Sequence, residues 1–258
     1  MTSITKQQLA DIKLLLQKKH REETGKFIIE GWKSVQEAAN AGAAIDTVLY
    51  DELRVENRKL LSWLQDHARR TYAVKSKELD SIADTVSAQG IVAVLPKISG
   101  AEHIAPVFSK EKSLIVVLDR INDPGNLGTI IRTCDWFGVD AVVIGKNSVE
   151  LTNPKVVRAT MGSLFHLPID EDADLRQFLT LCKKEKYVIY STELTGSKDL
   201  RSISFAEKAV VVIGSESHGV SDEVSALADH KILIPQFGKA ESLNAAMACG
   251  IILSHIKL

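Results

Sequence analysis

Three segments of the sequence place glycines beside charged and amide side chains, and each follows an apolar run. They are DRINDPGNLGTIIR at 119–132, GSESHG at 214–219 and IPQFGKAESLN at 234–244. In the second segment, glycines at both ends let the backbone approach a ligand closely, and Glu216 stands at the carboxyl end of the preceding strand. In parallel sheets, ligands bind where the loops after the strands converge. These three loops are therefore the candidate ligand site, and a simple turn is the alternative explanation for the glycine–acid–glycine loop at 214–219.

The first segment predicts a helix with one apolar face. Pro124 and Gly125 form a turn, and Asn126 is predicted to cap the helix by accepting a hydrogen bond from a first-turn N–H group. A core-facing stripe follows at positions i, i+3, i+4 and i+7, formed by Leu127, Ile130, Ile131 and Cys134. Arg132 lies roughly 140° around the helix from Leu127. Its side chain is therefore predicted to point away from the core, toward solvent, a ligand or another subunit.

The other two segments argue against one class of enzyme and predict a second helix. GSESHG is not the GxGxxG pattern of a dinucleotide site, and no such pattern follows a predicted strand, which argues against a dinucleotide-dependent dehydrogenase. In the third segment, Ser242 is predicted to cap a helix that begins at Leu243. That helix carries small residues that allow close packing, in the core or against another subunit, at Ala245, Ala246, Ala248 and Gly250.

The elements that carry these loops divide the chain into two α/β parts. In the first part, short strands alternate with helices and predict a mixed sheet, with strands at 26–29, 47–50, 72–74 and 91–95. In the second part, the strands are nearly continuous β-branched runs, at 114–119, 141–145, 187–192, 210–214 and 231–235. Such runs are typical of a sheet buried on both faces, so we predict a parallel-sheet α/β sandwich. The predicted domains are 1–97 and 113–258, joined by a linker at 98–112.

Composition limits the class of protein. A chain of 258 residues is long enough for two domains, and 45% hydrophobic and 25% charged residues exclude disordered and fibrous proteins. No apolar run approaches the roughly 20 residues of a membrane span, and the N-terminus lacks the apolar region of a secretory signal. We therefore predict a cytoplasmic protein without a membrane partner. The widely spaced Cys134, Cys182 and Cys249 fit neither a disulfide framework nor a metal motif and are predicted to be reduced and buried.

The charge distribution leaves two interpretations open. A net charge of −1 argues against a uniformly basic surface. The densest basic stretch holds Lys6, Lys13, Lys18, Lys19, Arg21, Lys26 and Lys33. A solvated helix face is the ordinary explanation for such a stretch, and a nucleic-acid contact is the alternative.

Taken together, the order, content and spacing of the three segments resemble the three sequence motifs of the SpoU-TrmH family of RNA ribose 2′-O-methyltransferases. Asn126 and Arg132 match the first motif and Glu216 matches the second, while the third is matched by Ser242, Leu243 and Asn244. The sequence departs from the commonest pattern at Ser215, where asparagine is frequent, and at Ala240, where valine is frequent. The resemblance covers about 114–258, and 27–50 also resembles the family's L30e-like N-terminal substrate-binding domain.

The resemblance implies a fold and a cofactor. Family members bind S-adenosylmethionine in a bent form through the backbone of a deep trefoil knot, which similarity places in the C-terminal part of this chain. Carried over by position, the cofactor contacts are Thr192, Gly214, the turn around Ile234, and Leu243. No metal or flavin is implied.

The resemblance also implies an activity, namely S-adenosylmethionine-dependent 2′-O-methylation of RNA by a homodimer. Ribosomal RNA is the expected substrate and tRNA the alternative. Arg132 matches the proposed acceptor or activator of the 2′-OH proton, but a guanidinium is a poor base, so we expect it to orient the hydroxyl and an RNA phosphate. The four other motif residues would hold the loops and the arginine in register: Asn126, Glu216, Ser242 and Asn244. A non-catalytic RNA-binding or ribosome-assembly protein is the alternative from another class, and the presence of all five residues favours the enzyme.

Overall fold

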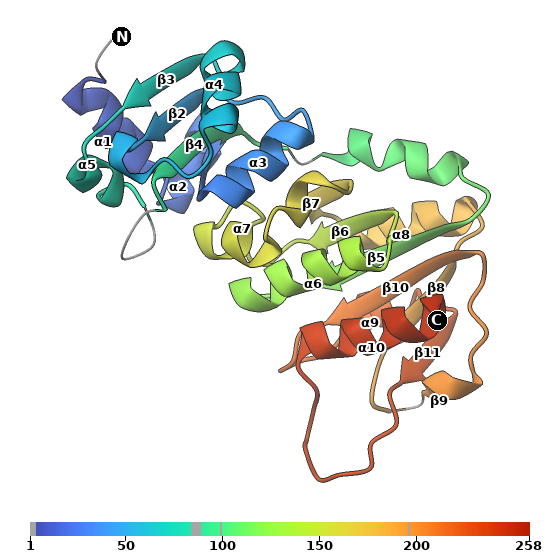
Figure 1. Cartoon of the computed structure of the whole chain (residues 1–258). Helices are drawn as coiled ribbons and strands as arrows, with labels where there is room; N and C mark the ends of the chain where they lie inside the picture. The colour runs from blue at the N-terminus through green and yellow to red at the C-terminus, as the bar shows by residue number, and fades with distance from the viewer. Residues whose placement is uncertain (1–3, 84–88, 99, 196) are drawn as a thin grey trace. The chain divides into compact units, whose positions relative to one another are not determined.

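The computed structural model describes residues 4–83, 89–98, 100–195 and 197–258 (Figure 1). Two compact units divide the chain. The first comprises Met1–Ile98 and Thr152–His166, and the second comprises Ser99–Leu151 and Leu167–Leu258. The predicted domains were continuous in sequence, whereas packing assigns a short segment from the middle of the chain to the first unit.

The first unit is built on a four-stranded mixed sheet with the strand order β1-β4-β2-β3. Strand β4 runs antiparallel to β1 and β2, and β2 runs parallel to β3. The predicted mixed sheet is confirmed, with strands β1 (Lys26–Glu30), β2 (Thr47–Tyr50), β3 (Arg70–Ala73) and β4 (Ile91–Pro96). Its helices are α1 (Lys6–Leu14), α2 (Lys18–Thr24), α3 (Trp32–Asn40), α4 (Arg58–His67), α5 (Ser76–Asp80) and, from the second segment, α7 (Pro154–Thr160).

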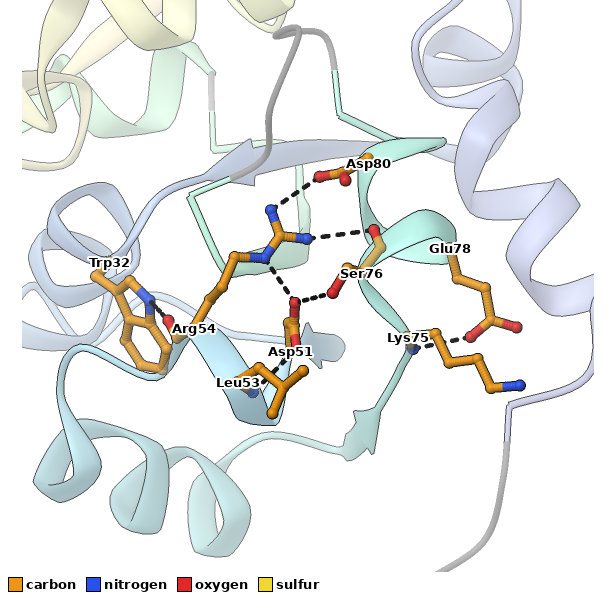
Figure 2. Close-up of polar contacts among 8 residues, drawn as sticks. All are labelled: Trp32, Asp51, Leu53, Arg54, Lys75, Ser76, Glu78 and Asp80. Carbon is orange, nitrogen blue, oxygen red and sulfur yellow. Dashed lines mark hydrogen bonds and ion pairs between the residues drawn. The ribbon is translucent and has the colours of Figure 1, made fainter.

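A polar network around the buried Asp51 orders the loop after β2 (Figure 2). The Asp51 carboxylate accepts hydrogen bonds from Arg54 Nε at 2.6 Å, Ser76 Oγ at 2.6 Å and the Leu53 backbone N–H at 3.0 Å. The Arg54 guanidinium also contacts Asp80, at 3.0 Å. The network therefore joins the segment after β2 to helix α5.

The basic N-terminal stretch does not form one free cationic face. Arg21 is buried and donates to the Leu15 carbonyl at 2.7 Å, and Lys26 pairs with Asp46 at 3.1 Å. Lys18 and Lys19 are exposed and lie beside glutamates one helical turn away. Arg21 is therefore a structural residue, and the proposed nucleic-acid contact loses part of its basis.

The second unit contains a seven-stranded sheet whose neighbouring strands are all parallel. The order is β7-β6-β5-β10-β8-β11-β9. The predicted parallel α/β fold is confirmed, with strands β5 (Ser113–Asp119), β6 (Ala141–Gly145), β7 (Ile169–Ala173), β8 (Val188–Thr192), β9 (Lys198–Asp199), β10 (Lys208–Gly214) and β11 (His230–Leu233). Its helices are α6 (Pro124–Trp136), α8 (Leu175–Lys184), α9 (Asp222–Ser225) and α10 (Ala245–Lys257).

The predicted linker contains two short 3-10 helices, Ala101–His103 and Ala105–Ser109. Ile104 and Val107 are buried in the core of the second unit, against strand residues such as Ile115 and Val117. The linker segment is therefore anchored by apolar contacts. No helix among the described residues is long and apolar enough to span a membrane.

Both predicted helix caps beside the site are wrong. Asp123 caps α6 and accepts from the Asn126 backbone N–H at 2.7 Å, because Pro124 occupies the first helical position. Asn244 caps α10 and accepts from the backbone N–H groups of Ala246 and Met247, whereas Ser242 lies before the cap. The predicted apolar stripe of α6 is confirmed, since Leu127, Ile130, Ile131 and Cys134 are all buried.

Candidate active site

The three motif segments meet at the carboxyl edge of the parallel sheet. Strands β5 and β10 are adjacent, and their register pairs Asp119 with Gly214 at this edge. Helix α6 begins shortly after β5, and the segment after β11 leads to α10, which packs against α6. The loops from distant parts of the sequence are therefore brought together, as expected for ligand sites in parallel sheets.

Three polar side chains form a cluster at this edge. Asn126 Nδ2 donates to the Glu216 carboxylate. Asn244 Nδ2 donates to Asn126 Oδ1 at 2.8 Å and lies 3.5 Å from Glu216 Oε1. The Ala245 backbone N–H also donates to Glu216 Oε1, at 3.2 Å. Glu216 therefore ties the start of α6 to the start of α10, and Asn244 both caps α10 and joins this cluster.

A tight turn positions Glu216. The Ser215 N–H donates to the Gly219 carbonyl at 3.2 Å, and the Gly219 N–H donates to the Ser215 carbonyl at 2.8 Å. A Cβ atom on Gly214 would lie 2.1 Å from the Gly219 carbonyl carbon, so only glycine fits there. Gly219 has a φ of +64°, a left-handed conformation that glycine adopts without steric cost. Gly214 is thus required by the close approach of the turn's own backbone and Gly219 by its conformation, and the predicted approach of this backbone to a ligand stays a prediction.

A cavity of about 610 Å³ lies beside the cluster. Its lining includes the four predicted cofactor contacts, Thr192, Gly214, Ile234 and Leu243. Apolar side chains contribute to its wall, among them Leu200, Ile213, Ile232 and Ile252. The volume and the mixture of apolar side chains with backbone groups suit a nucleoside-sized organic ligand.

Glu193 braces the wall of this cavity and was not predicted from the sequence. Its carboxylate accepts from Ser191 Oγ at 2.7 Å, Ser225 Oγ at 2.6 Å and Lys231 Nζ at 2.8 Å. Burial raises the pKa of Glu193, but the hydrogen bonds from Lys231 and the two serines together lower it by more than burial raises it. The net pKa therefore lies below the usual value. The ionised side chain ties the end of β8 to α9 and β11.

Asp119 is a second brace that the sequence analysis did not single out. It is buried at the end of β5, and its Oδ2 accepts from the Ser221 backbone N–H at 2.7 Å. This bond fixes the exit of the Glu216 turn against the neighbouring strand. An acidic residue that directly ends an apolar strand was the available signal for this role.

Arg132 and Ser242 stand apart from the polar cluster. Arg132 is exposed on α6, as its helical position predicted, and lies six residues after Asn126, about 9 Å along the helix axis. Its side chain has no hydrogen bond or ion pair with any residue in the described part of the chain. Ser242 is exposed and lines the cavity. The structure thus joins three of the five predicted catalytic residues and leaves Arg132 on the outer face.

Helices α6 and α10 both expose large apolar side chains. Trp136 on α6 is 85% exposed, and Met247 and Ile251 on α10 are 62% and 39% exposed. Of the small residues of α10, Ala245 and Ala246 are buried and Gly250 lies next to Thr133 of α6. These contacts fit the first of the two predicted alternatives, close packing within the chain's own core, and the subunit contact stays a prediction.

Comparisons with known proteins agree with this arrangement. The SpoU rRNA Methylase family matches residues 113–254, and the MRM3-like substrate binding domain matches residues 6–93. The chain is 31% identical over 256 residues to the 23S rRNA (guanosine(2553)-2′-O)-methyltransferase RlmP of Bacillus subtilis, covering 99% of this chain and 98% of the relative.

Solved structures show the same likeness. The AdoMet-bound rRNA methyltransferase from Sinorhizobium meliloti is 33% identical with a TM-score of 0.89, covering 99% of this chain and 96% of that one. The SpoU methyltransferase AviRb from Streptomyces viridochromogenes, in complex with AdoMet, is 27% identical with a TM-score of 0.87, covering 98% and 97%. With its three motifs meeting at one sheet edge, the chain belongs to the SpoU rRNA methylase family.

Proposed function

We propose that this protein is an S-adenosylmethionine-dependent RNA 2′-O-ribose methyltransferase that acts on ribosomal RNA. The observation that carries the proposal is the hydrogen-bonded cluster of Asn126, Glu216 and Asn244 beside a cavity. The named activity of the Bacillus subtilis relative favours ribosomal RNA over tRNA. The AdoMet-bound relatives support the choice of cofactor.

The cavity fits this cofactor in size and chemistry. Its volume of about 610 Å³ lies within the range of small-molecule sites. The apolar wall suits an adenine face, and backbone groups near Gly214 and Ile234 can supply matched donors and acceptors for its ring nitrogens. When bound, the cofactor supplies an electrophilic methyl group on its sulfonium.

The protein side chains then position the ribose hydroxyl. In the proposed mechanism, Arg132 binds the 2′-OH oxygen and an adjacent RNA phosphate, for which its planar guanidinium is well suited. The guanidinium stays protonated, so the hydroxyl proton would leave to water while the O–CH₃ bond forms and the bond between the methyl group and sulfur breaks. The hydrogen bonds among Asn126, Glu216 and Asn244 fix the start of α6 against the start of α10, and so fix the helix that carries Arg132. Orientation of the two reactants can lower the barrier by several kcal/mol, on the order of 7–11 kcal/mol in the best intramolecular cases.

The proposed assembly is a homodimer across the outer face of α6 and α10. Trp136, Met247 and Ile251 expose apolar surface there, and burial of this surface against a second copy would be favourable. Arg132 lies on the same helix face as Trp136, four residues earlier. A two-fold dimer would therefore place Arg132 of one chain against its partner and toward the partner's site.

Two features that the family resemblance implies belong to this proposal, a deep trefoil knot in the C-terminal part and an L30e-like fold of the first domain. The domain limits 1–97, 98–112 and 113–258 and a cytoplasmic location, which the sequence pattern predicts, are proposed with them. The match to a substrate binding domain supports RNA recognition by the first unit.

The test measures cofactor binding and methyl transfer with purified protein. Calorimetry is expected to show S-adenosylmethionine binding, and a labelled methyl group is expected to enter unmodified 23S rRNA. Because a 2′-O-methyl group blocks alkaline cleavage, the label should survive in an alkali-resistant dinucleotide. Arg132→Ala is expected to bind the cofactor normally and to lower the rate by roughly 100-fold or more.

Arg176→Ala is the matched control, because Arg176 is another exposed helical arginine of the second unit. It should retain the wild-type rate. Absence of cofactor binding by the wild-type protein would contradict the enzyme and favour the RNA-binding protein. Label that is lost to alkali would contradict 2′-O-methylation.

A further inference from the structure

Arg120 has a backbone conformation that is unusual for its residue type. It directly follows β5, at the same sheet edge as the Glu216 turn, and its φ is +60°. A residue with a side chain pays a steric cost in this left-handed region, whereas glycine does not. Strained residues of this kind concentrate at functional sites. The side chain at position 120 is therefore the feature to explain.

The Arg120 guanidinium is held only loosely. Nη2 lies 3.5 Å from the Gly219 carbonyl oxygen, and Nε lies 3.5 Å from Asp119 Oδ1. Nε finds no hydrogen-bond acceptor among the described residues. By contrast, Arg201 makes a two-point contact with Asp199, at 2.5 Å and 3.1 Å. Since Nε is buried, the donors that Arg120 can offer to a ligand are its terminal nitrogens, whose one hydrogen bond among the described residues is the long contact to Gly219, and the side chain is 34% exposed.

The surroundings of Arg120 indicate which kind of anion its guanidinium binds. The residues that line the cofactor cavity include Gly219 but, within the described chain, not Arg120. Its guanidinium therefore lies beside the Glu216 turn and outside the cofactor cavity. We propose that Arg120 binds a phosphate of the RNA substrate next to the methylated ribose. This assignment rests on the proposed function, and a guanidinium fork is the side chain best matched to a phosphate.

Lys186 provides a matched control for the test. It is exposed, has a φ of +65° and lies between α8 and β8, at the amino edge of the same sheet. Arg120→Gly and Lys186→Gly each remove one positive charge and give a left-handed position to glycine. Both variants are expected to fold at least as stably as the wild type, which thermal unfolding checks.

The experiment measures the affinity for a 23S rRNA fragment over a series of salt concentrations, together with calorimetry of S-adenosylmethionine. Arg120→Gly is expected to bind RNA roughly tenfold more weakly. Its log–log salt slope should fall by about 0.7–0.9, the loss of one phosphate contact. Lys186→Gly should match the wild type in RNA affinity and in salt slope. The two variants should each bind the cofactor as the wild type does.

Four results would overturn the assignment. Equal RNA affinity of Arg120→Gly and wild type, or equal losses in both variants, would show that position 120 holds no specific phosphate. A weakened cofactor affinity in Arg120→Gly would assign the side chain to the carboxylate of S-adenosylmethionine instead. Failure of the wild-type protein to bind and methylate RNA would overturn the proposed function, and this assignment with it.

Discussion

At the scale of single residues, Asn244 has two separable roles. Its Oδ1 caps α10 by accepting from the backbone N–H groups of Ala246 and Met247, and its Nδ2 donates to Asn126. Serine is also a good cap, but its side chain is too short to reach Asn126. The cap stabilises the helix, whereas the amide contact aligns the two helices at the site.

Substitutions at Asn244 should therefore separate stability from activity. Asn244→Ala is expected to lose about 1 kcal/mol of folding free energy together with methyl transfer, whereas Asn244→Ser should keep the stability within about 0.5 kcal/mol and still lose the activity. Chemical denaturation and methyl-transfer assays measure the two effects. An active Asn244→Ser variant would show that the link to Asn126 is dispensable.

Asp51 makes stability depend on pH. Burial raises the pKa of Asp51, but hydrogen bonds from Ser76, Arg54 and the Leu53 backbone together lower it by more than burial raises it. Its net pKa in the folded chain therefore lies below 3.8. A lowered carboxyl pKa stabilises the fold above the unfolded-state pKa, and this stabilisation is lost as the pH falls through the folded-state pKa.

Asp51→Asn is accordingly expected to lower stability by about 1–3 kcal/mol at pH 7. The difference from wild type should shrink as the pH falls below 3.8, the unfolded-state value. Thermal unfolding at a series of pH values measures it. A difference that stays constant down to pH 2 would mean that Asp51 contributes through shape and not through its charge.

At the scale of elements, the turn after β10 depends on close backbone approach. Gly214→Ala would place a Cβ atom 2.1 Å from the backbone of Gly219, which cannot move as a flexible side chain could. Gly250 on α10 is the contrasting case, because a Cβ there would lie at an ordinary 3.8 Å from Thr133 Cγ2.

The two alanine substitutions should thus change the folding stability in opposite directions. Gly214→Ala is expected to cost about 1–3 kcal/mol or more and to abolish cofactor binding, since the turn lines the cavity. Gly250→Ala should raise stability by about 0.5–1 kcal/mol. Denaturation midpoints and calorimetry distinguish them. Similar losses in both variants would contradict the tight turn at Gly214.

The sequence predicted the buried strands well because their signal is local. Strands Thr47–Tyr50 and Ala141–Gly145 have the predicted bounds, since uninterrupted apolar runs mark them. Strand β7 has the sequence IDEDA, lies at the sheet edge and is only partly buried. Because three of its residues are acidic, it lacks the apolar run that marked the other strands, and it was not predicted. Strand β9 has two residues and no periodicity to detect.

The site was predictable only in part. Helical periodicity alone placed Arg132 away from the core, whereas the association of Asn126, Glu216 and Asn244 required the motif resemblance. Glu193 escaped prediction because its partners come from three elements that only the folded sheet brings together. The packing of Thr152–His166 with the first unit likewise leaves no pattern in the sequence.

At the scale of the whole molecule, the proposed dimer predicts that inactive chains can rescue each other. If Arg132 acts on the partner's site, mixing Arg132→Ala with Asn244→Ser chains creates dimers with one intact site. Since half of the dimers are mixed, an equal mixture should recover about one quarter of the wild-type activity after subunit exchange. No recovery in fully exchanged dimers, or full activity of a monomer by light scattering, would contradict a shared site.

The central claim is tested most directly by a map of 2′-O-methyl groups in ribosomal RNA. The comparison uses cells with the gene, cells without it, and deletion cells that express wild type, Arg132→Ala or Arg176→Ala. We predict that one ribosomal RNA nucleotide loses its 2′-O-methyl group on deletion and regains it with wild type and Arg176→Ala, but not with Arg132→Ala. Identical ribosomal RNA maps in all five strains would contradict the proposed activity.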